Sequence, residues 1–221
     1  MTTIFPTIYH DKYGTVTTII KNDGKALSML LRGVEFTGSM FDDFGPEKQN
    51  SAELNLFTIN NGSLCSCELE CEIPIILKLE GNETESVLHT YIELGGAKSN
   101  GGIEYERFEL KLYVENKLFK SSRENGWFED SLWEVQSQLP DNISIKSCYT
   151  CAYSAYHPAG YGAFGCLGCF RNHKKEILDV QTKDQLMNLY DDQVEIVQET
   201  WICFDYENRQ EMLGSNKRLR P

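Results

Sequence analysis

The chain has 221 residues, of which 41% are hydrophobic and 24% are charged, and its formal charge at pH 7 is −12. These values are typical of a globular protein and exclude a largely disordered chain. The acidic excess disfavours binding to duplex DNA, because phosphate contacts need clustered Lys and Arg. No run approaches the roughly 18 apolar residues of a membrane-spanning helix, so we expect no membrane partner.

The N-terminal sequence and the cysteine count predict a compartment. The first residues, 1–6, contain no basic region followed by an apolar stretch, so they do not resemble a secretory signal. Eight cysteines in a chain of this length are too few for a disulfide scaffold. We therefore expect a cytoplasmic protein whose cysteines are reduced core residues, metal ligands or redox groups.

The first half of the chain has the pattern of β-structure. Residues 15–20, 34–40 and 54–59 are short apolar or alternating runs. The triplets Asn22-Asp23-Gly24 and Asn60-Asn61-Gly62 separate them, and these residue types tolerate the positive φ of tight turns. The pattern predicts short strands joined by hairpin turns.

The most regular alternation lies at residues 64–71. Cys65, Cys67 and Cys71 fall on one face of this segment and three polar residues on the other, so we expect these thiols in a core. Further strands are expected over 73–79, 87–94, 108–114 and 118–121. The sequence predicts a mainly β (α+β) fold: an antiparallel β-sandwich or curled sheet with two short helices and a zinc-stapled C-terminal section.

The hydrophobic period changes to that of a helix after Gly126. Phe128, Leu132, Val135 and Leu139 have helical spacing, and a second helix is expected from Thr182, which has capping-box spacing with Gln185. The last clear strand is expected over 194–203. The predicted organisation is a β-rich body over 1–126, a helix with a cysteine-rich zinc-binding section packed on the body over 127–213, and a frayed tail over 214–221.

Two cysteine pairs predict a metal site. Cys148-x2-Cys151 and Cys166-x2-Cys169 are separated by 14 residues. Two CxxC pairs near this spacing are typical of a four-thiolate zinc site, in which each pair wraps one side of a tetrahedral ion. Zn²⁺ fits because it is redox-silent and suits soft thiolate ligands.

A fifth thiol leaves the fourth ligand open. Cys203 ends the last expected strand, which can bring a ligand from far along the chain. Cys148, Cys151 and Cys169 would then be completed by Cys203, with Cys166 outside the site. Spacing alone favours Cys166, so the two thiols compete for one position.

A basic island, residues 142–175, surrounds these cysteines. It contains Lys146, Arg171, Lys174 and Lys175 but no acidic residue, so the chain's net −12 leaves −16 for the remainder. These cations can offset the −2 of a zinc ion with four thiolates, or they can contact single-stranded nucleic acid. Six rings are interleaved with them and either cover the metal or stack on bases: Tyr149, Tyr153, Tyr156, Tyr161, Phe164 and Phe170.

Signals of catalysis are weak. The loop from Tyr156 to Gly165 contains GxGxxG, but neither the preceding strand nor the following helix of a dinucleotide site is expected there. The sequence has no HExxH, GxSxG or GxxxxGK[ST] motif. His157 and His173 flank the cysteines and are alternative ligands. Because four thiolates leave no open position for water, such a site is structural, and an enzyme is not expected.

Residues 148–171 resemble an uncharacterised bacterial family with the signature CxxCxYSxYxPxGxxxFGxxxCFR. A later ETxxC element corresponds here to Glu199, Thr200 and Cys203, whereas Cys166 is not part of the pattern. Because the pattern includes Cys203 and not Cys166, the resemblance favours Cys203 as the fourth ligand. Members look like accessory proteins found near bacterial toxin genes, which implies an immunity or binding role.

We therefore expect a non-enzymatic, acidic interaction protein with a structural zinc site, which binds a basic protein partner such as a toxin that it inhibits. One alternative is an enzyme or small-ligand-binding protein that uses the loop from Tyr156 to Gly165. A second is a single-stranded nucleic-acid binder that uses residues 142–175.

Overall fold

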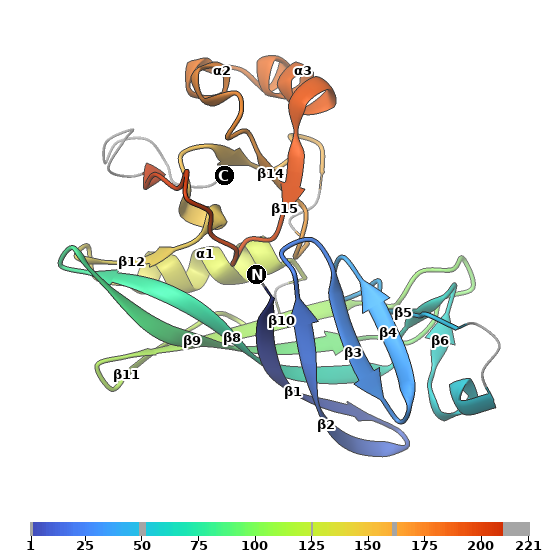
Figure 1. Ribbon diagram of the computed structural model, residues 1–221. Coiled ribbons are helices and arrows are strands. Elements are labelled where there is room, and N and C mark those ends of the chain that lie inside the picture. The colour runs from blue at the N-terminus through green and yellow to red at the C-terminus, as the bar shows by residue number, and fades with distance from the viewer. Residues whose placement is uncertain (1, 49–51, 125, 161–162, 210–221) are drawn as a thin grey trace. The chain divides into compact units, whose positions relative to one another are not determined.

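The alternating apolar runs of the first half form one large, open, antiparallel sheet, and the fold is mainly β (Figure 1). This computed structural model describes residues 2–48, 52–124, 126–160 and 163–209. The described strands of the large sheet lie in a single open layer, so they do not form the two packed sheets of a sandwich.

The chain divides into two compact units. The sheet unit contains Met1–Pro74 and Val87–Leu139, and the cysteine unit contains Ile75–Ser86 and Pro140–Pro221. The tail expected over 214–221 lies outside the described residues.

The large sheet has the strand order β11-β10-β9-β8-β1-β2-β3-β4-β5 among the described residues, and β12 also pairs with β8. Its strands are β1 (Thr3–Asp11), β2 (Gly14–Asn22), β3 (Leu27–Leu31), β4 (Val34–Gly38), β5 (Gly45–Pro46), β8 (Cys67–Leu79), β9 (Asn82–Leu94), β10 (Glu106–Val114), β11 (Lys117–Lys120) and β12 (Ile143–Lys146). Two small sheets contain β6 (Ile59–Asn60) with β7 (Ser63–Leu64), and β13 (Ser154–Ala155) with β14 (Leu167–Cys169) and β15 (Glu195–Val197). The helices are α1 (Phe128–Gln138), α2 (Lys174–Asp179) and α3 (Lys183–Gln193), with 3-10 turns η1 (Ala52–Leu56) and η2 (Cys148–Thr150).

Strand β8 carries a proline in its interior. Separate strands were expected over 64–71 and 73–79, but β8 runs without a break from Cys67 to Leu79, and Leu64 belongs to β7. Along one edge it pairs with β1 as far as Cys71 and with β12 from Ile76 onward. Pro74 lies between these two partners, so its missing N–H interrupts neither ladder.

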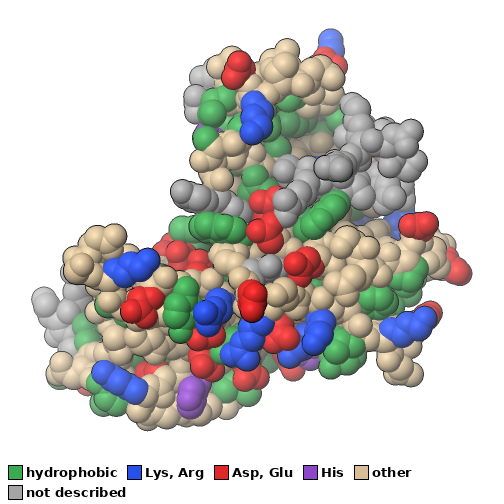
Figure 2. All heavy atoms as spheres, turned by 180° about the vertical axis from the view of Figure 1, so that it is seen from behind, with side chains coloured by type: hydrophobic (Ala, Val, Ile, Leu, Met, Phe, Trp, Pro, Cys, Tyr) green, Lys and Arg blue, Asp and Glu red, His purple; other side chains and the backbone are tan. Residues whose placement is uncertain are grey.

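The predicted core face of the cysteine-rich strand is confirmed. Cys65, Cys67 and Cys71 are buried, and burial raises the pKa of Cys71 to about 12. The opposite face of the sheet unit remains accessible and includes apolar side chains such as Ile8 and Ile19. Figure 2 shows acidic, basic and hydrophobic side chains interspersed over the face that it presents.

The predicted turn at residues 60–62 has the expected backbone, whereas in the triplet 22–24 only Gly24 has a positive φ. Asn61 and Gly62 have φ of 49° and 90° and join β6 to β7. Glu115 and Asn116, with φ of 48° and 66°, join β10 to β11 in the same way. Consecutive positive φ values are those of the hairpin turns that match the twist of antiparallel strands.

Both predicted helices form. Helix α1 buries Phe128, Leu132 and Val135, and the Phe128 ring packs edge-on against Phe108 of β10 at a centroid distance of 5.6 Å. Helix α3 begins after Thr182, whose side chain and that of Gln185 form the predicted capping box. None of the described helices is long and apolar enough to cross a membrane.

Three local predictions are wrong. Residues 54–59 begin as the 3-10 turn η1, and only the end of the run enters a strand, β6. Helix α2 was not expected, because its six residues are too few to show a period. The last strand, expected over 194–203, ends at Val197; beyond it the Trp201 N–H donates back to the Gln198 carbonyl at 3.1 Å, which turns the chain.

Candidate metal centre

The first cysteine pair lies on η2, and a distant segment runs beside it. The Cys148 N–H donates to the Trp201 carbonyl at 2.6 Å, and the Tyr149 N–H donates to the Glu199 carbonyl at 3.0 Å. The Ala152 N–H donates to the carbonyl of Glu207 at 2.8 Å. These bonds hold residues 199–207, and therefore Cys203, along the CxxC turn.

Cys169 reaches the same turn through the small sheet. It ends β14 and pairs with Ser154 of β13 on one side and with Glu195 of β15 on the other. The Ser154 hydroxyl is within hydrogen-bond distance of the Cys148 carbonyl, at 2.6 Å, and of the Cys151 carbonyl, at 3.1 Å. Strand pairing and this hydroxyl together place Cys169 beside the first cysteine pair.

Four thiols interact electrostatically. Burial raises the pKa of Cys148, and the nearby thiols of Cys169, Cys151 and Cys203 raise it further. Burial also raises the pKa values of Cys151 and Cys169, to both of which Cys203 adds an upward contribution. The structure therefore brings Cys148, Cys151, Cys169 and Cys203 into one neighbourhood.

Cys166 contacts Tyr190 of α3. The Tyr190 hydroxyl donates to the Cys166 carbonyl at 3.2 Å. Burial raises the pKa of Tyr190 to about 12, and Cys166 is the next largest cause. These contacts place Cys166 beside α3, and the choice of Cys203 over Cys166 as the fourth ligand stays a prediction.

The thiols do not form a finished ligand cage. Within the described ranges, no three His, Cys, Asp or Glu side chains are arranged so that they could hold a metal ion. Cys148, Cys151 and Cys169 are each less than 8% exposed, whereas Cys203 is partly exposed. The raised pKa values of Cys148, Cys151 and Cys169 favour neutral thiols, which neither repel one another nor need a counter-charge.

Two guanidinium groups adjoin these thiols. Arg171 forms an ion pair with Glu195 and interacts electrostatically with Cys169 and Cys203. Arg209 is 6% exposed, and its Nη2 donates to the Cys151 carbonyl at 2.8 Å and to the Ser154 hydroxyl at 2.9 Å. No signal in the sequence pointed to Arg209, because it lies outside the basic island.

Other cations of the basic island pair with carboxylates from outside it. The Lys146 ammonium contacts Glu83, and the Lys174 ammonium lies 2.8 Å from the Asp205 carboxylate. Lys174 also lies over the ring of Tyr153, 4.9 Å from its centroid. Much of the positive charge in residues 142–175 is therefore balanced within the unit.

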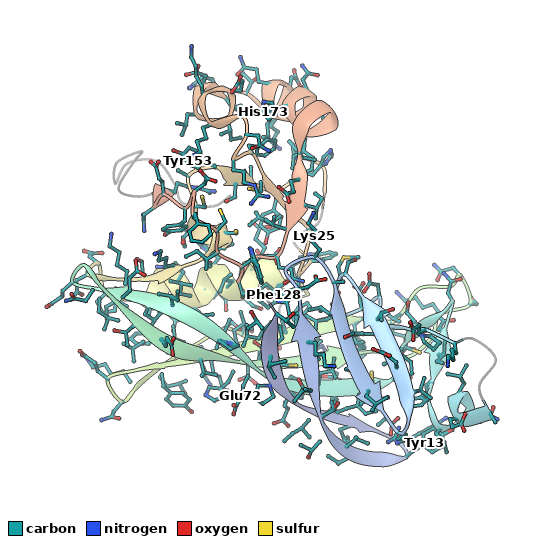
Figure 3. The ribbon with its side chains drawn as sticks, viewed as in Figure 1. Tyr13, Lys25, Glu72, Phe128, Tyr153 and His173 are labelled. Atoms are coloured by element: carbon teal, nitrogen blue, oxygen red, sulfur yellow. The ribbon has the colours of Figure 1, made fainter. Side chains whose placement is uncertain are left out.

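The aromatic residues of the island form the core of the cysteine unit. Tyr153 is 3% exposed and lies apart from His173 in Figure 3. The His157 ring contacts Tyr190 edge-on at 4.9 Å rather than the thiols. Four more rings of the island are also buried: Tyr149, Tyr156, Phe164 and Phe170. Tyr161 lies outside the described residues.

A buried carboxyl closes the glycine-rich loop. Glu199 accepts hydrogen bonds from the Tyr156 hydroxyl at 2.9 Å and from the Gly165 N–H at 2.7 Å. Burial raises the pKa of Glu199 to about 7, although these two donors lower it. The Glu199 side chain thus links the two ends of the loop from Tyr156 to Gly165. The Tyr156 hydroxyl and the Gly165 N–H are therefore already hydrogen-bonded within the protein.

Comparison with known proteins gives one match. A family model described as a family of unknown function, DUF6304, matches residues 3–154. This range covers the β-rich part and Cys148 and Cys151, but it ends before Cys169 and Cys203. No curated protein and no solved structure matches the chain.

Proposed function

Because the chain belongs to the DUF6304 family, whose function is unknown, we propose its role from its residues: a non-catalytic interaction protein with a structural Zn²⁺. The observation that supports this proposal is the electrostatic coupling of Cys148, Cys151, Cys169 and Cys203, which converge from a span of more than 50 residues. The proposed fourth ligand is Cys203 and not Cys166.

The chemistry of the neighbourhood favours zinc. Thiolates are preferred ligands of Zn²⁺, and four of them leave the site with a formal charge of about −2. Arg171 and Arg209 supply two positive charges beside Cys169 and Cys151. Since burial lowers the pKa of Arg209, a neighbouring anion would also stabilise this buried guanidinium.

Zinc and protons compete for these sulfurs. The raised pKa values of Cys148, Cys151 and Cys169 mean that the metal-free unit holds protonated thiols at neutral pH. Binding of Zn²⁺ releases those protons and draws the sulfurs into a complete ligand set. Zinc affinity should therefore rise with pH.

A structural role is favoured over a catalytic one. Four thiolates fill a tetrahedral coordination shell and leave no position for water or substrate. Glu199 already occupies the polar groups of Tyr156 and Gly165 in the adjacent loop. The buried rings likewise disfavour stacking on nucleic-acid bases, which needs exposed aromatic faces.

A cysteine-to-serine series tests the metal. Zinc content and the sulfur-to-metal charge-transfer absorption of the Co²⁺-substituted protein should show one ion bound by four thiolates. Cys203→Ser should lose the ion to a competing chelator, and Cys166→Ser is the matched control that should retain it. A metal-free wild type that is fully folded, or loss of metal in Cys166→Ser alone, would contradict this assignment.

The proposed partner is a basic protein in the cytoplasm, such as a toxin that this chain inhibits. The net charge of −12 supports it, because complementary charge speeds encounter and sets specificity. The immobilised chain should retain a basic protein from an extract of its source cells at low salt and release it as salt rises. Retention of no basic protein at low salt would refute the partner class.

A further inference from the structure

The outer face of the large sheet, opposite α1, contains a groove within the sheet unit. The groove has a volume of about 630 Å³ and crosses β1, β2, β8, β9 and β10. Figure 3 shows Glu72, one of its lining residues, on the opposite side of the sheet from Phe128 of α1. This outer groove is therefore distinct from both the core and the cysteine unit.

One side of the outer groove is apolar. Ile8 of β1 and Ile19 of β2 are each 43% exposed and line it together with Pro6. Pro6 lies directly opposite Ile19 in the ladder, and Ile8 lies opposite Thr17, so these side chains form a continuous strip. An exposed strip of β-branched side chains across two strands is a binding surface for aliphatic groups.

The adjoining strand supplies carboxylates. Glu70 of β8 is the ladder partner of Ile8, so its side chain lies next to the apolar strip. Glu72 follows on the same face, with an oxygen 3.9 Å from Nδ1 of His89. Among the described residues, the Glu70 carboxylate makes no ion pair or side-chain hydrogen bond.

The cations of the outer groove have carboxylate partners of their own. The Lys111 ammonium lies 3.4 Å from Glu109, and the Arg123 guanidinium lies 3.7 Å from Glu93. Arg123 also stacks on the Tyr91 ring at 4.1 Å from its centroid. Glu70 is thus left as uncompensated negative charge beside an aliphatic strip.

We propose that the outer groove binds an extended peptide segment of a partner, in which Lys or Arg and aliphatic residues take turns at every second position and so share one face of the segment. The inference rests on the proposed interaction role and assigns its docking surface. A Lys or Arg side chain fits this juxtaposition, because its methylene stem covers Ile8 while its charged head reaches Glu70. Aliphatic side chains two residues away, on the same face of the segment, cover Ile19 and Pro6.

The probe is a fluorescently labelled peptide of repeated Lys-Ser-Val-Ser, called the Lys-Val peptide, in which Lys and Val share one face when the chain is extended. Its binding to the full chain is measured by anisotropy at low salt. The same repeat with Glu in place of Lys is the charge control. The wild type should prefer the Lys-Val peptide, and the double variant Glu70→Gln/Glu72→Gln should weaken its binding about tenfold. Ile8→Ser should weaken it by a similar factor, because the Lys stem loses its apolar contact.

Two control variants separate docking from general attraction. Glu35→Gln/Glu47→Gln removes the same charge from exposed positions of β4 and the segment after β5, and Leu30→Ser removes an exposed apolar group of β3. Both should bind the Lys-Val peptide as the wild type does. Equal weakening by these controls would overturn the groove as the docking surface.

The remaining outcomes are also decisive. If the wild type captures a basic protein but the groove variants capture it equally well, this inference fails and the proposed function stands. If the wild type binds no basic protein or peptide, both fail. If sedimentation shows a dimer that Ile8→Ser dissociates, the groove binds a second copy of the chain, and the peptide proposal is overturned.

Discussion

Glu106 provides a test of how burial controls the stability of the sheet unit. It occupies an inward-facing position of β10, two residues before the fully buried Phe108. Burial raises its pKa from 4.5 to about 8, and the nearby Asp42 carboxyl raises it further. A carboxyl with a raised folded-state pKa stabilises the fold below pH 4.5, and that contribution is lost as the pH rises through about 8.

The size of the effect follows from the two pKa values. At pH 7 the carboxyl of Glu106 is ionised in the unfolded chain but stays protonated in the folded chain. This difference lowers the free energy of unfolding by about 3 kcal/mol. At about pH 5 the same difference is only about 1 kcal/mol. Glu106→Gln removes this titration and keeps the size of the side chain, so it should stabilise the protein more at pH 7 than at pH 5.

The assay is urea unfolding followed by tryptophan fluorescence at both pH values. A Trp201→Phe background leaves Trp127 and Trp133 as reporters, and both belong to the sheet unit. Glu35→Gln, on the exposed face of β4, is the matched control and should leave the pH profile of the parent unchanged. A gain from Glu106→Gln that does not grow with pH would refute the reasoning.

Three further changes probe other contacts. Asp11→Asn should cost about 3 kcal/mol in urea unfolding, because Arg32 would lose a 99%-buried ion-pair partner. Burial opposes ionisation of Asp11, but hydrogen bonds from Arg32 lower its pKa overall. The difference in the free energy of unfolding between the wild type and this variant should therefore shrink as the pH falls below 3.8. Leu132→Ala should cost about 3 kcal/mol through a cavity under α1, with no change in its pH dependence. Thr182→Ala should cost α3 about 1 kcal/mol, measured as faster amide hydrogen exchange in that helix alone.

Local features of the fold could be predicted from the sequence because short-range physics determines them. The alternation around Cys67 specified a half-buried strand, and Asn61-Gly62 specified a tight turn. The capping box of Thr182 specified the start of α3. In each case the residues that carry the signal are neighbours in the chain.

Features that depend on distant partners could not be predicted. Whether Pro74 ends a strand depends on β1 and β12, which are far away in the sequence. The position of Cys203 beside η2 depends on hydrogen bonds between residues 199–207 and residues 148–152. The burial of Glu106 could not be predicted either, because it depends on the register of β10. A shift of the register by one residue would move the same side chain to the outer face.

The candidate ligands of the cysteine unit come from segments that are far apart in the sequence. Cys148 and Cys151 lie on or next to η2, Cys169 ends β14, and Cys203 lies beyond β15. A bound ion that joins these segments would add its binding free energy to the folding of this unit. Removal of the proposed zinc should therefore loosen the cysteine unit before the sheet unit.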